Sequence, residues 1–159
     1  LNTVDYSVLM ERFIEHYKCA AEETRAFPGV VTALQSLRND GFQLGLCTNK
    51  PRAPLIPTLE SAGLYDAFDV VIAGDDLEKR KPDPMPLVHI MSVLRAQSCV
   101  YVGDSDVDAE SAHRADVPFL FFTEGIRTAP IADIRHDAAF SAFSELPELV
   151  RRFADVKSY

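Results

Sequence analysis

The sequence VYVGDSDVDAESA, at residues 100–112, decides the fold. It contains most of an apolar run at residues 99–102, which is too short for a buried helix and is predicted to form a buried strand. Three carboxylates follow at Asp104, Asp106 and Asp108, and a helix is predicted over residues 107–115. A buried strand, a polar turn and a helix in succession form the repeating unit of an α/β fold.

The same unit recurs along the chain. Strands are predicted at residues 42–47, 68–72, 118–122 and 138–140, and helices at residues 6–23, 30–39, 52–62, 84–94 and 146–153. Alternating strands and helices joined by short loops predict an α/β fold with a doubly wound parallel sheet. In such a sheet ligands bind at the carboxyl ends of the strands, so the residues after each strand are the candidates for function.

Composition and charge narrow the class of protein. The 159 residues are 47% hydrophobic, enough for one ordinary core, which excludes a disordered chain and a disulfide-rich miniature scaffold. The 16 Lys and Arg against 24 Asp and Glu give a net charge of −8, which disfavours nucleic acid and anionic membranes as partners. There is no apolar span of ~20 residues and no secretory signal pattern. Because Cys19, Cys47 and Cys99 are also predicted to be reduced core residues, we expect a cytoplasmic protein.

Thr48 and Asn49 follow the predicted strand at residues 42–47. A hydroxyl and an amide between a strand and a helix suit an anion, because the backbone N–H groups at a helix start are free to donate. Thr48 could instead serve only as a cap for that helix, and this segment by itself favours the cap.

Three cations, Lys79, Arg80 and Lys81, occupy the loop after the second predicted strand. Most charge runs of this kind are solvated surface. Lys81 differs from the other two because Pro82 follows it and biases its backbone to an extended conformation. Lys81 is therefore the best candidate in this loop for a fixed positive charge.

The three aspartates of residues 104–108 would repel one another unless a cation neutralises them. Carboxylate oxygens suit Mg²⁺, which binds through one or two protein carboxylates and keeps several waters. Ser105 or Asp106 could instead cap the following helix, but a cap accounts for only one carboxylate, so the pattern favours a metal site. The four histidines are scattered without ligand spacing and are not candidates for catalysis.

Taken together, LGLCTNKP at residues 44–51, RKPDP at residues 80–84 and VYVGDSDVDAESA occur in the order and spacing of three motifs of one family. Over residues 27–122 the chain resembles the haloacid dehalogenase superfamily of phosphohydrolases, and it is most similar to the bacterial phosphoglycolate phosphatase branch. The resemblance implies a Rossmann-like core, hydrolysis of a small phosphorylated substrate such as 2-phosphoglycolate, and Mg²⁺ as the cofactor.

The resemblance also implies a role for each motif residue. Thr48 and the backbone of Asn49 would hydrogen-bond the transferred phosphoryl group, and Lys81 would offset the charge of the nucleophile and the phosphate. Asp104 and Asp108 would hold Mg²⁺ directly or through water, whereas Asp106 falls at a variable position and is left out of the metal set. These roles agree with the chemistry, since phosphoryl transfer depends mainly on positioning and on electrostatic stabilisation.

The family's nucleophile motif does not occur in these 159 residues. That motif is an apolar strand followed by Asp-x-Asp-Gly-Thr, whose first aspartate becomes an aspartyl-phosphate and whose second acts as acid and base. In the family its strand lies between the strands that here end at Thr48 and Asp104, and a helical cap follows it. We therefore expect residues 1–26 to be the C-terminal remnant of the cap and residues 27–159 to be an incomplete core. We also expect the 159 residues alone to be inactive.

Three other interpretations stay open. A sugar-phosphate mutase shares these motifs, and most of the cap residues that would discriminate it are missing. A dehalogenase fits less well because it needs no metal, whereas Asp104 and Asp108 predict one. A non-enzymatic module would keep the phosphate and metal site without the nucleophile. The sequence carries no signal for an oligomeric state.

Overall fold

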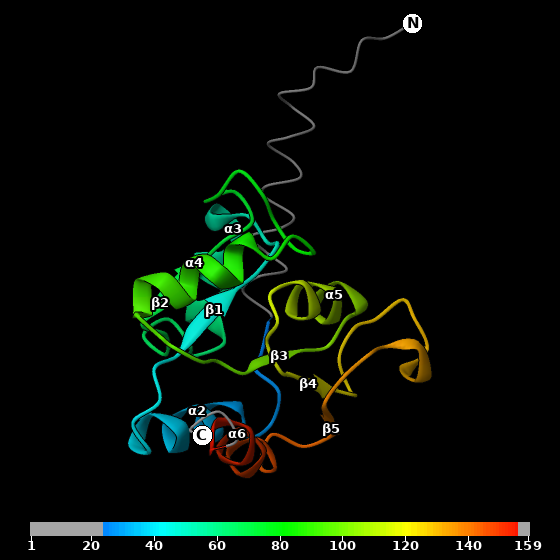
Figure 1. The fold of residues 1–159 in the computed structure, drawn as a ribbon. Coiled ribbons are helices and arrows are strands. Elements are labelled where there is room, and N and C mark those ends of the chain that lie inside the picture. Colours follow the sequence, from blue (N-terminus) through cyan, green and yellow to red (C-terminus); the bar gives the residue numbers. More distant parts are fainter. Residues whose placement is uncertain (1–23, 156–159) are drawn as a thin grey trace, which may run out of the picture.

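The computed structural model describes residues 24–155, and Figure 1 shows their arrangement. The predicted helix at residues 6–23, Cys19 and nearly all of the predicted cap remnant lie outside the described residues. None of the helices in the described part of the chain is long and apolar enough to cross a membrane.

Strands and helices alternate as the sequence predicts. In chain order the elements are α2 (Val30–Asn39), β1 (Gly45–Cys47), α3 (Arg52–Ser61), β2 (Val70–Ile72), α4 (Met85–Leu94), β3 (Tyr101–Gly103), α5 (Asp106–Arg114), β4 (Phe119–Phe122), the 3₁₀ helix η1 (Ile131–Asp133), β5 (Ala138–Phe140) and α6 (Leu146–Asp155). Every strand and helix predicted within residues 24–155 is present. Only η1 was not predicted.

The strands form two parallel sheets. In the first, β1 pairs with β2, with Leu46 opposite Val71. In the second, the strand order is β3-β4-β5, with Val102 opposite Leu120. Within residues 24–155 no strand joins β1 to β3, so the division falls between the strand that precedes Thr48 and the strand that precedes Asp104. The α/β prediction with a parallel sheet is confirmed, and the sheet is in two parts.

Helices cover both faces of the three-stranded sheet. Alternate residues of β4 point to opposite faces, and all four residues of this strand are buried. Leu120 packs with α2 and α6, which lie side by side at the bottom of Figure 1, and Phe121 packs with α5 on the other face. Burial of each such side chain contributes about 1.5–3 kcal/mol, so β4 is the best-anchored strand of the core.

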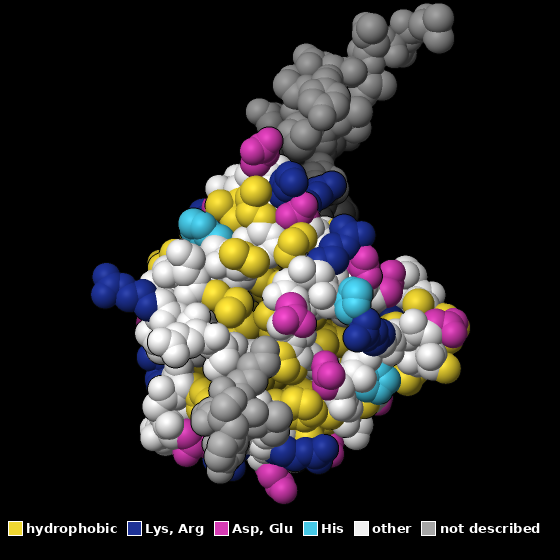
Figure 2. All heavy atoms as spheres, in the orientation of Figure 1, with side chains coloured by type: hydrophobic (Ala, Val, Ile, Leu, Met, Phe, Trp, Pro, Cys, Tyr) yellow, Lys and Arg dark blue, Asp and Glu magenta, His cyan; other side chains and the backbone are white. Residues whose placement is uncertain are grey.

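The two-stranded sheet is covered by α4 and α3. Leu87 and Ile90 of α4 pack against Cys47 and Ile72, and α3 packs Leu55 and Leu59 against Ala73. Two other α4 side chains, Val88 and Val93, are each 52% exposed, and hydrophobic side chains remain visible on this side of the molecule in Figure 2. In β1 and β2 only Cys47 and Ile72 are buried, so this half of the core is less completely covered than β4.

Candidate active site

Parallel pairing brings the functional candidates to the carboxyl ends of the strands. Thr48 and Asn49 directly follow β1, and Asp104 directly follows β3. The loop between β2 and α4 supplies Lys81, and α5 supplies Asp108. The structure brings Lys81 into contact with Asp108 and Asn49, and it links the Asp104 backbone to Asp108.

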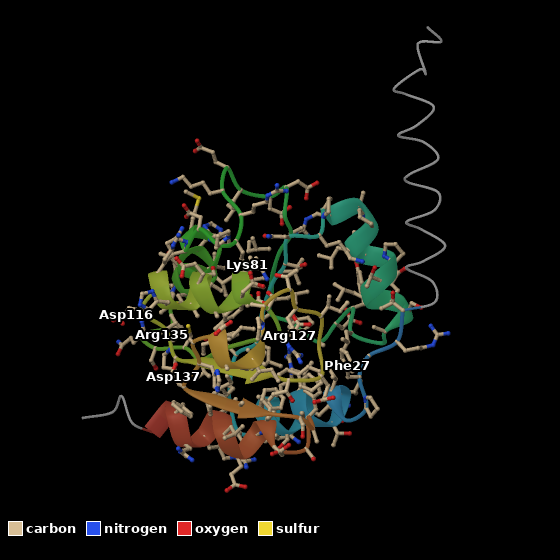
Figure 3. All side chains as sticks on the ribbon, turned by 90° about the vertical axis from the view of Figure 1, so that its right-hand side faces the viewer. Phe27, Lys81, Asp116, Arg127, Arg135 and Asp137 are labelled. Atoms are coloured by element: carbon tan, nitrogen blue, oxygen red, sulfur yellow. The ribbon has the colours of Figure 1, made fainter. Side chains whose placement is uncertain are left out.

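Lys81 lies at the division between the two sheets. Its ammonium group donates to the Cys47 carbonyl at 3.1 Å, to the Tyr101 hydroxyl at 3.0 Å and to Asp108 Oδ1 at 2.6 Å. These acceptors belong to the end of β1, to β3 and to α5, so one side chain connects both sheets and a helix. The side chain is only 11% exposed, which makes Lys81, labelled in Figure 3, a fixed charge as the sequence predicts.

The loop that carries Lys81 is held by neighbouring segments. The Asn49 side-chain amide donates to the Lys81 carbonyl at 2.9 Å. Ser111, which is fully buried in α5, donates from its hydroxyl to the Asp83 carbonyl at 3.2 Å. The Lys81–Pro82 peptide bond is cis. The two hydrogen bonds hold the backbone carbonyls of Lys81 and Asp83 in place.

The Asp108 carboxylate is saturated with hydrogen bonds. Its Oδ1 accepts from Lys81 and from the Tyr101 hydroxyl, the latter at 2.8 Å. Its Oδ2 accepts from the backbone N–H groups of Asp104 and Ser105, both at 3.2 Å, and from the Ser105 hydroxyl at 2.6 Å. The side chain is 7% exposed. Asp108 therefore acts as the anchor to which the motif and Lys81 are both attached.

Two pKa shifts follow from these contacts. Burial by itself would raise the pKa of Asp108, but the Lys81 charge and the hydrogen bonds from Lys81, Ser105 and Tyr101 outweigh it and hold the pKa below its usual value. Burial raises the pKa of Tyr101 well above its usual value, and the adjacent Asp108 charge adds to the effect. At neutral pH the cluster therefore contains a carboxylate and a neutral phenol.

The start of α5 explains why this motif needs small residues. Ser105 caps the helix by accepting from the Asp108 N–H, and the Asp108 carboxylate accepts in return from the Ser105 N–H, which completes a capping box. The alternative expectation that Ser105 caps this helix is thus confirmed. Gly103 lies so close that a Cβ atom there would be 2.5 Å from the Asp108 Cβ, so only glycine leaves room for the buried carboxylate.

Asp104 faces different partners. Its Oδ2 accepts from the backbone N–H of Ile126 at 2.9 Å, and no described residue donates to its Oδ1. Asp106 points to the same loop, since its Oδ1 accepts from the Thr128 hydroxyl at 3.1 Å. Asp104, Asp106 and Asp108 are the same type of residue in one short motif, but each has a different set of contacts.

The acidic residues fit Mg²⁺ unequally. Residues 24–155 contain no group of three or more His, Cys, Asp or Glu arranged to hold a metal. Mg²⁺ needs only one or two carboxylates, because water fills its other positions. No described residue donates to Oδ1 of Asp104, so this oxygen could bind the cation. Direct binding by Asp108 would instead displace an existing hydrogen bond. The geometry therefore fits Asp104 as a direct ligand and Asp108 as a residue that holds the Asp104 backbone in place.

Thr48 does not cap α3, contrary to the alternative that its segment alone favours. The Thr48 hydroxyl accepts from the Lys50 N–H at 3.1 Å, and the residue at the N-cap of α3 is Pro51, without a side-chain cap. No described residue accepts from the Asn49 N–H. The Asn49 Oδ1 is buried without a hydrogen-bond partner in the described structure, which is costly for a polar atom.

Sequence reasoning missed several residues that position the site. Tyr101 was assigned only to a strand, Ser111 only to a helix, and Gly125 and Ile126 to no functional role. A period-2 pattern could have shown which face of β3 carries Tyr101, but not that Lys81 reaches the same face. The contact between Ile126 and Asp104 joins residues 22 positions apart and depends on the path of a loop.

Comparison with known proteins agrees with the motifs. The model of the haloacid dehalogenase-like hydrolase family matches residues 2–122. A phosphoglycolate phosphatase of Cereibacter sphaeroides is 44% identical over 145 residues, which cover 91% of this chain and 66% of that protein. The crystal structure of a predicted phosphoglycolate phosphatase from Haemophilus somnus 129PT has a TM-score of 0.73 at 28% identity and covers 77% of this chain and 56% of its own.

A second solved structure is similar in fold. CbbY from Rhodobacter sphaeroides, crystallised with phosphate, has a TM-score of 0.76 at 18% identity and covers 91% of this chain and 67% of its own. The chain spans about two thirds of the length of the Cereibacter relative. The motif order, the Lys81–Asp108 pair and the match over residues 2–122 lead to one conclusion: this chain belongs to the haloacid dehalogenase-like hydrolase family.

Proposed function

We propose that the complete protein is a Mg²⁺-dependent phosphomonoester hydrolase that converts 2-phosphoglycolate to glycolate and phosphate through an aspartyl-phosphate. The observation that carries this proposal is the largely buried Lys81–Asp108 ion pair at the strand ends, where Lys81 also contacts the Cys47 carbonyl and the Asn49 side chain. The name of the 44% identical relatives supports the choice of substrate.

The charges of the site suit a phosphoryl group. A phosphate monoester brings negative charge, and phosphoryl transfer is accelerated mainly by positioning and by stabilising that charge. Lys81 supplies a fixed ammonium group, the Thr48 hydroxyl can donate a hydrogen bond, and the Asn49 N–H is without an acceptor in the described structure. The Thr48 hydroxyl and the Asn49 N–H would orient the phosphoryl oxygens. Lys81, whose three N–H groups already donate to Cys47, Tyr101 and Asp108, would contribute its charge.

Asp104 would hold Mg²⁺, and Asp108 would hold Lys81 and the Asp104 backbone in place. When bound, Mg²⁺ supplies charge neutralisation and polarises a phosphoryl oxygen. The assignment of Asp104 rests on its Oδ1, to which no described residue donates. Asp108 would contribute through water and through its contacts with neighbouring residues.

The nucleophile would be an aspartate from a segment outside these 159 residues. Its strand would lie between β1 and β3, joining the two sheets into one. Three observations support this part of the proposal. Among residues 24–155 the two sheets are separate at that position and no group donates to Asn49 Oδ1, and the chain covers 66% of its relative. The carboxylate would form a bond to phosphorus as the bond to the leaving glycolate oxygen breaks, and water would then hydrolyse the acyl phosphate.

The remaining expectations belong to the same proposal. Residues 1–26 would be the end of a helical cap, and residues 27–159 most of the catalytic core. The protein would act in the cytoplasm on a small phosphorylated molecule, without binding nucleic acid or membranes, in keeping with its net charge of −8.

The test is phosphate release by the complete protein from 2-phosphoglycolate and from β-glucose-1-phosphate, with Mg²⁺ and with EDTA. We expect Mg²⁺-dependent release from 2-phosphoglycolate, and a loss of about 100-fold or more in kcat/KM in Lys81→Met, since a preorganised positive group is removed from the transition state. Lys79→Met is the matched control, because Lys79 lies in the same loop but is 56% exposed and pairs with Asp83.

The mutase and the non-enzymatic module each predict a different result in this assay. Conversion of β-glucose-1-phosphate to an isomer without release of phosphate would favour the mutase. No turnover of either substrate by a folded, Mg²⁺-binding protein would favour the non-enzymatic module. Robust turnover by residues 1–159 alone would contradict the external nucleophile.

A further inference from the structure

The loop at residues 123–130 runs from β4 to η1, and its Ile126 contacts Asp104, the residue that follows β3. No sequence motif marks it. It nevertheless touches the carboxylate that we assign to Mg²⁺, and Figure 3 labels one of its residues, Arg127. Its contacts are of a kind that would orient a metal ligand.

The closest contact is made by the backbone of the turn at Gly125 and Ile126. The Ile126 N–H donates to Asp104 Oδ2 at 2.9 Å. At Gly125 a Cβ atom would lie 2.2 Å from both Cβ and Oδ2 of Asp104. Real Cβ atoms do not approach so closely, so any side chain at position 125 would have to displace the Asp104 carboxylate.

The turn is fixed at both ends. The Arg127 guanidinium donates back to the Thr123 carbonyl, which closes the loop on itself. The Thr128 hydroxyl donates to Asp106 Oδ1 at 3.1 Å, and Ala129 packs against the core cluster that contains Phe121. A loop tied down in this way presents the Ile126 N–H from a defined position.

The Ile126 side chain takes no part in this arrangement. Ile126 is 86% exposed, so its side chain buries little apolar surface. What the site uses is the backbone N–H of this residue. The role of the Ile126 N–H can therefore be tested separately from that of the side chain, because one substitution can change the side chain and another can remove the N–H group.

We propose that the Gly125–Ile126 turn is a positioning element for the metal-binding carboxylate of Asp104. The Ile126 N–H holds Oδ2, so Oδ1 would be left to bind the cation, and Gly125 is required because the carboxylate fills the space of a side chain. The proposal rests on the proposed function in assuming that Asp104 binds Mg²⁺. Partners of this kind fix the orientation of a ligand, and their loss typically weakens metal binding by 10–100-fold.

The experiment measures the Mg²⁺ concentration that gives half of the maximal rise in Tm for the complete protein. We expect Gly125→Ala and Ile126→Pro each to raise this midpoint by about 10-fold or more. Ile126→Ala is the matched control, because it retains the backbone N–H, and its midpoint should equal that of the wild type. The Tm without Mg²⁺ reports folding separately.

The outcomes distinguish this proposal from the proposed function. Wild-type midpoints in both Gly125→Ala and Ile126→Pro would overturn the positioning role while leaving Mg²⁺ binding intact. A wild-type protein whose Tm does not respond to Mg²⁺ would overturn the metal assignment and, with it, the positioning role. If one of the two variants fails to fold, the other decides. Failure of both, with Ile126→Ala folded, would show a structural role and count against the proposal.

Discussion

Two carboxylates of one motif, Asp104 and Asp108, have opposite surroundings. The Asp108 cluster, consisting of Lys81, Tyr101 and Asp108, is buried and its hydrogen bonds are complete. The Asp104 turn, consisting of Asp104, Gly125 and Ile126, holds one carboxylate oxygen and leaves the other without a donor in the described structure. The difference indicates a division of labour in which one aspartate assembles the site and the other is presented to a ligand.

Removing the partner of the buried carboxylate should have the largest effect. In Lys81→Ala the Asp108 charge would stay buried without its cation, and the free energy of unfolding should fall by about 3–5 kcal/mol. Urea denaturation of the complete protein without Mg²⁺ measures this. Lys79→Ala, which breaks the Lys79–Asp83 pair at the surface, should leave the urea midpoint close to that of the wild type. Equal losses in the two variants would remove the distinction between the Asp108 cluster and ordinary surface pairs.

Loss of the Tyr101 hydroxyl should have a smaller effect on the same cluster. Tyr101→Phe deletes the donor to Asp108 Oδ1 and one acceptor of Lys81 while keeping the ring, so we expect a loss of about 1–3 kcal/mol in urea. Tyr65→Phe is the control, since Tyr65 is 53% exposed, and it should leave the free energy of unfolding unchanged within about 0.5 kcal/mol. A Tyr101 variant as stable as its control would show that Lys81 and Asp108 do not need the phenol.

The Asp108 cluster should make the free energy of unfolding depend on pH in the acid range. The pKa of Asp108 is lower in the folded protein than its ordinary value of 3.8, so the unfolded chain binds this proton more readily. The resulting stability is present above pH 3.8 and is lost as the pH falls through the folded pKa. Urea midpoints between pH 6 and pH 3 should therefore fall less steeply in Asp108→Asn than in the wild type. Parallel curves would mean that Asp108 contributes nothing to the acid dependence.

Asp104 should matter least for folding and most for metal. Asp104→Asn keeps the size of the side chain and an oxygen for the Ile126 N–H, so the free energy of unfolding without Mg²⁺ should change by no more than about 0.5 kcal/mol. The rise in Tm on adding Mg²⁺ should disappear. A retained rise in Asp104→Asn that is lost in Asp108→Asn would reverse the division of labour between the two aspartates.

The sequence predicts the order of strands and helices well because each element repeats the same pattern of apolar residues and turns. The ends of the elements are less predictable. The run at residues 42–47 is apolar, but only Gly45–Cys47 pair with β2, because the partner strand decides where pairing begins. The helix at residues 52–62 was predicted despite Pro57, and α3 does continue through that residue.

The candidate site was predictable only in part. Lys81 stood out because of Pro82, and Ser105 as one of two residues that could cap the next helix. Neither observation predicts that Asp108 is buried against Lys81, since the two residues come from segments 27 positions apart. Likewise, nothing local marks Gly125 as the neighbour of Asp104. Such contacts depend on the packing of β3, β4 and their loops, which a local pattern does not encode.

The most direct test of the central claim is a Mg²⁺ titration of phosphate release from 2-phosphoglycolate by the complete protein and by Asp104→Asn. We predict saturable, EDTA-sensitive release by the wild type and a loss of at least about 100-fold in Asp104→Asn at any Mg²⁺ concentration at which the wild type is saturated. Release that is independent of Mg²⁺, or equal in the two proteins, would contradict the claim that a metal-dependent phosphatase site is built on Asp104 and Lys81.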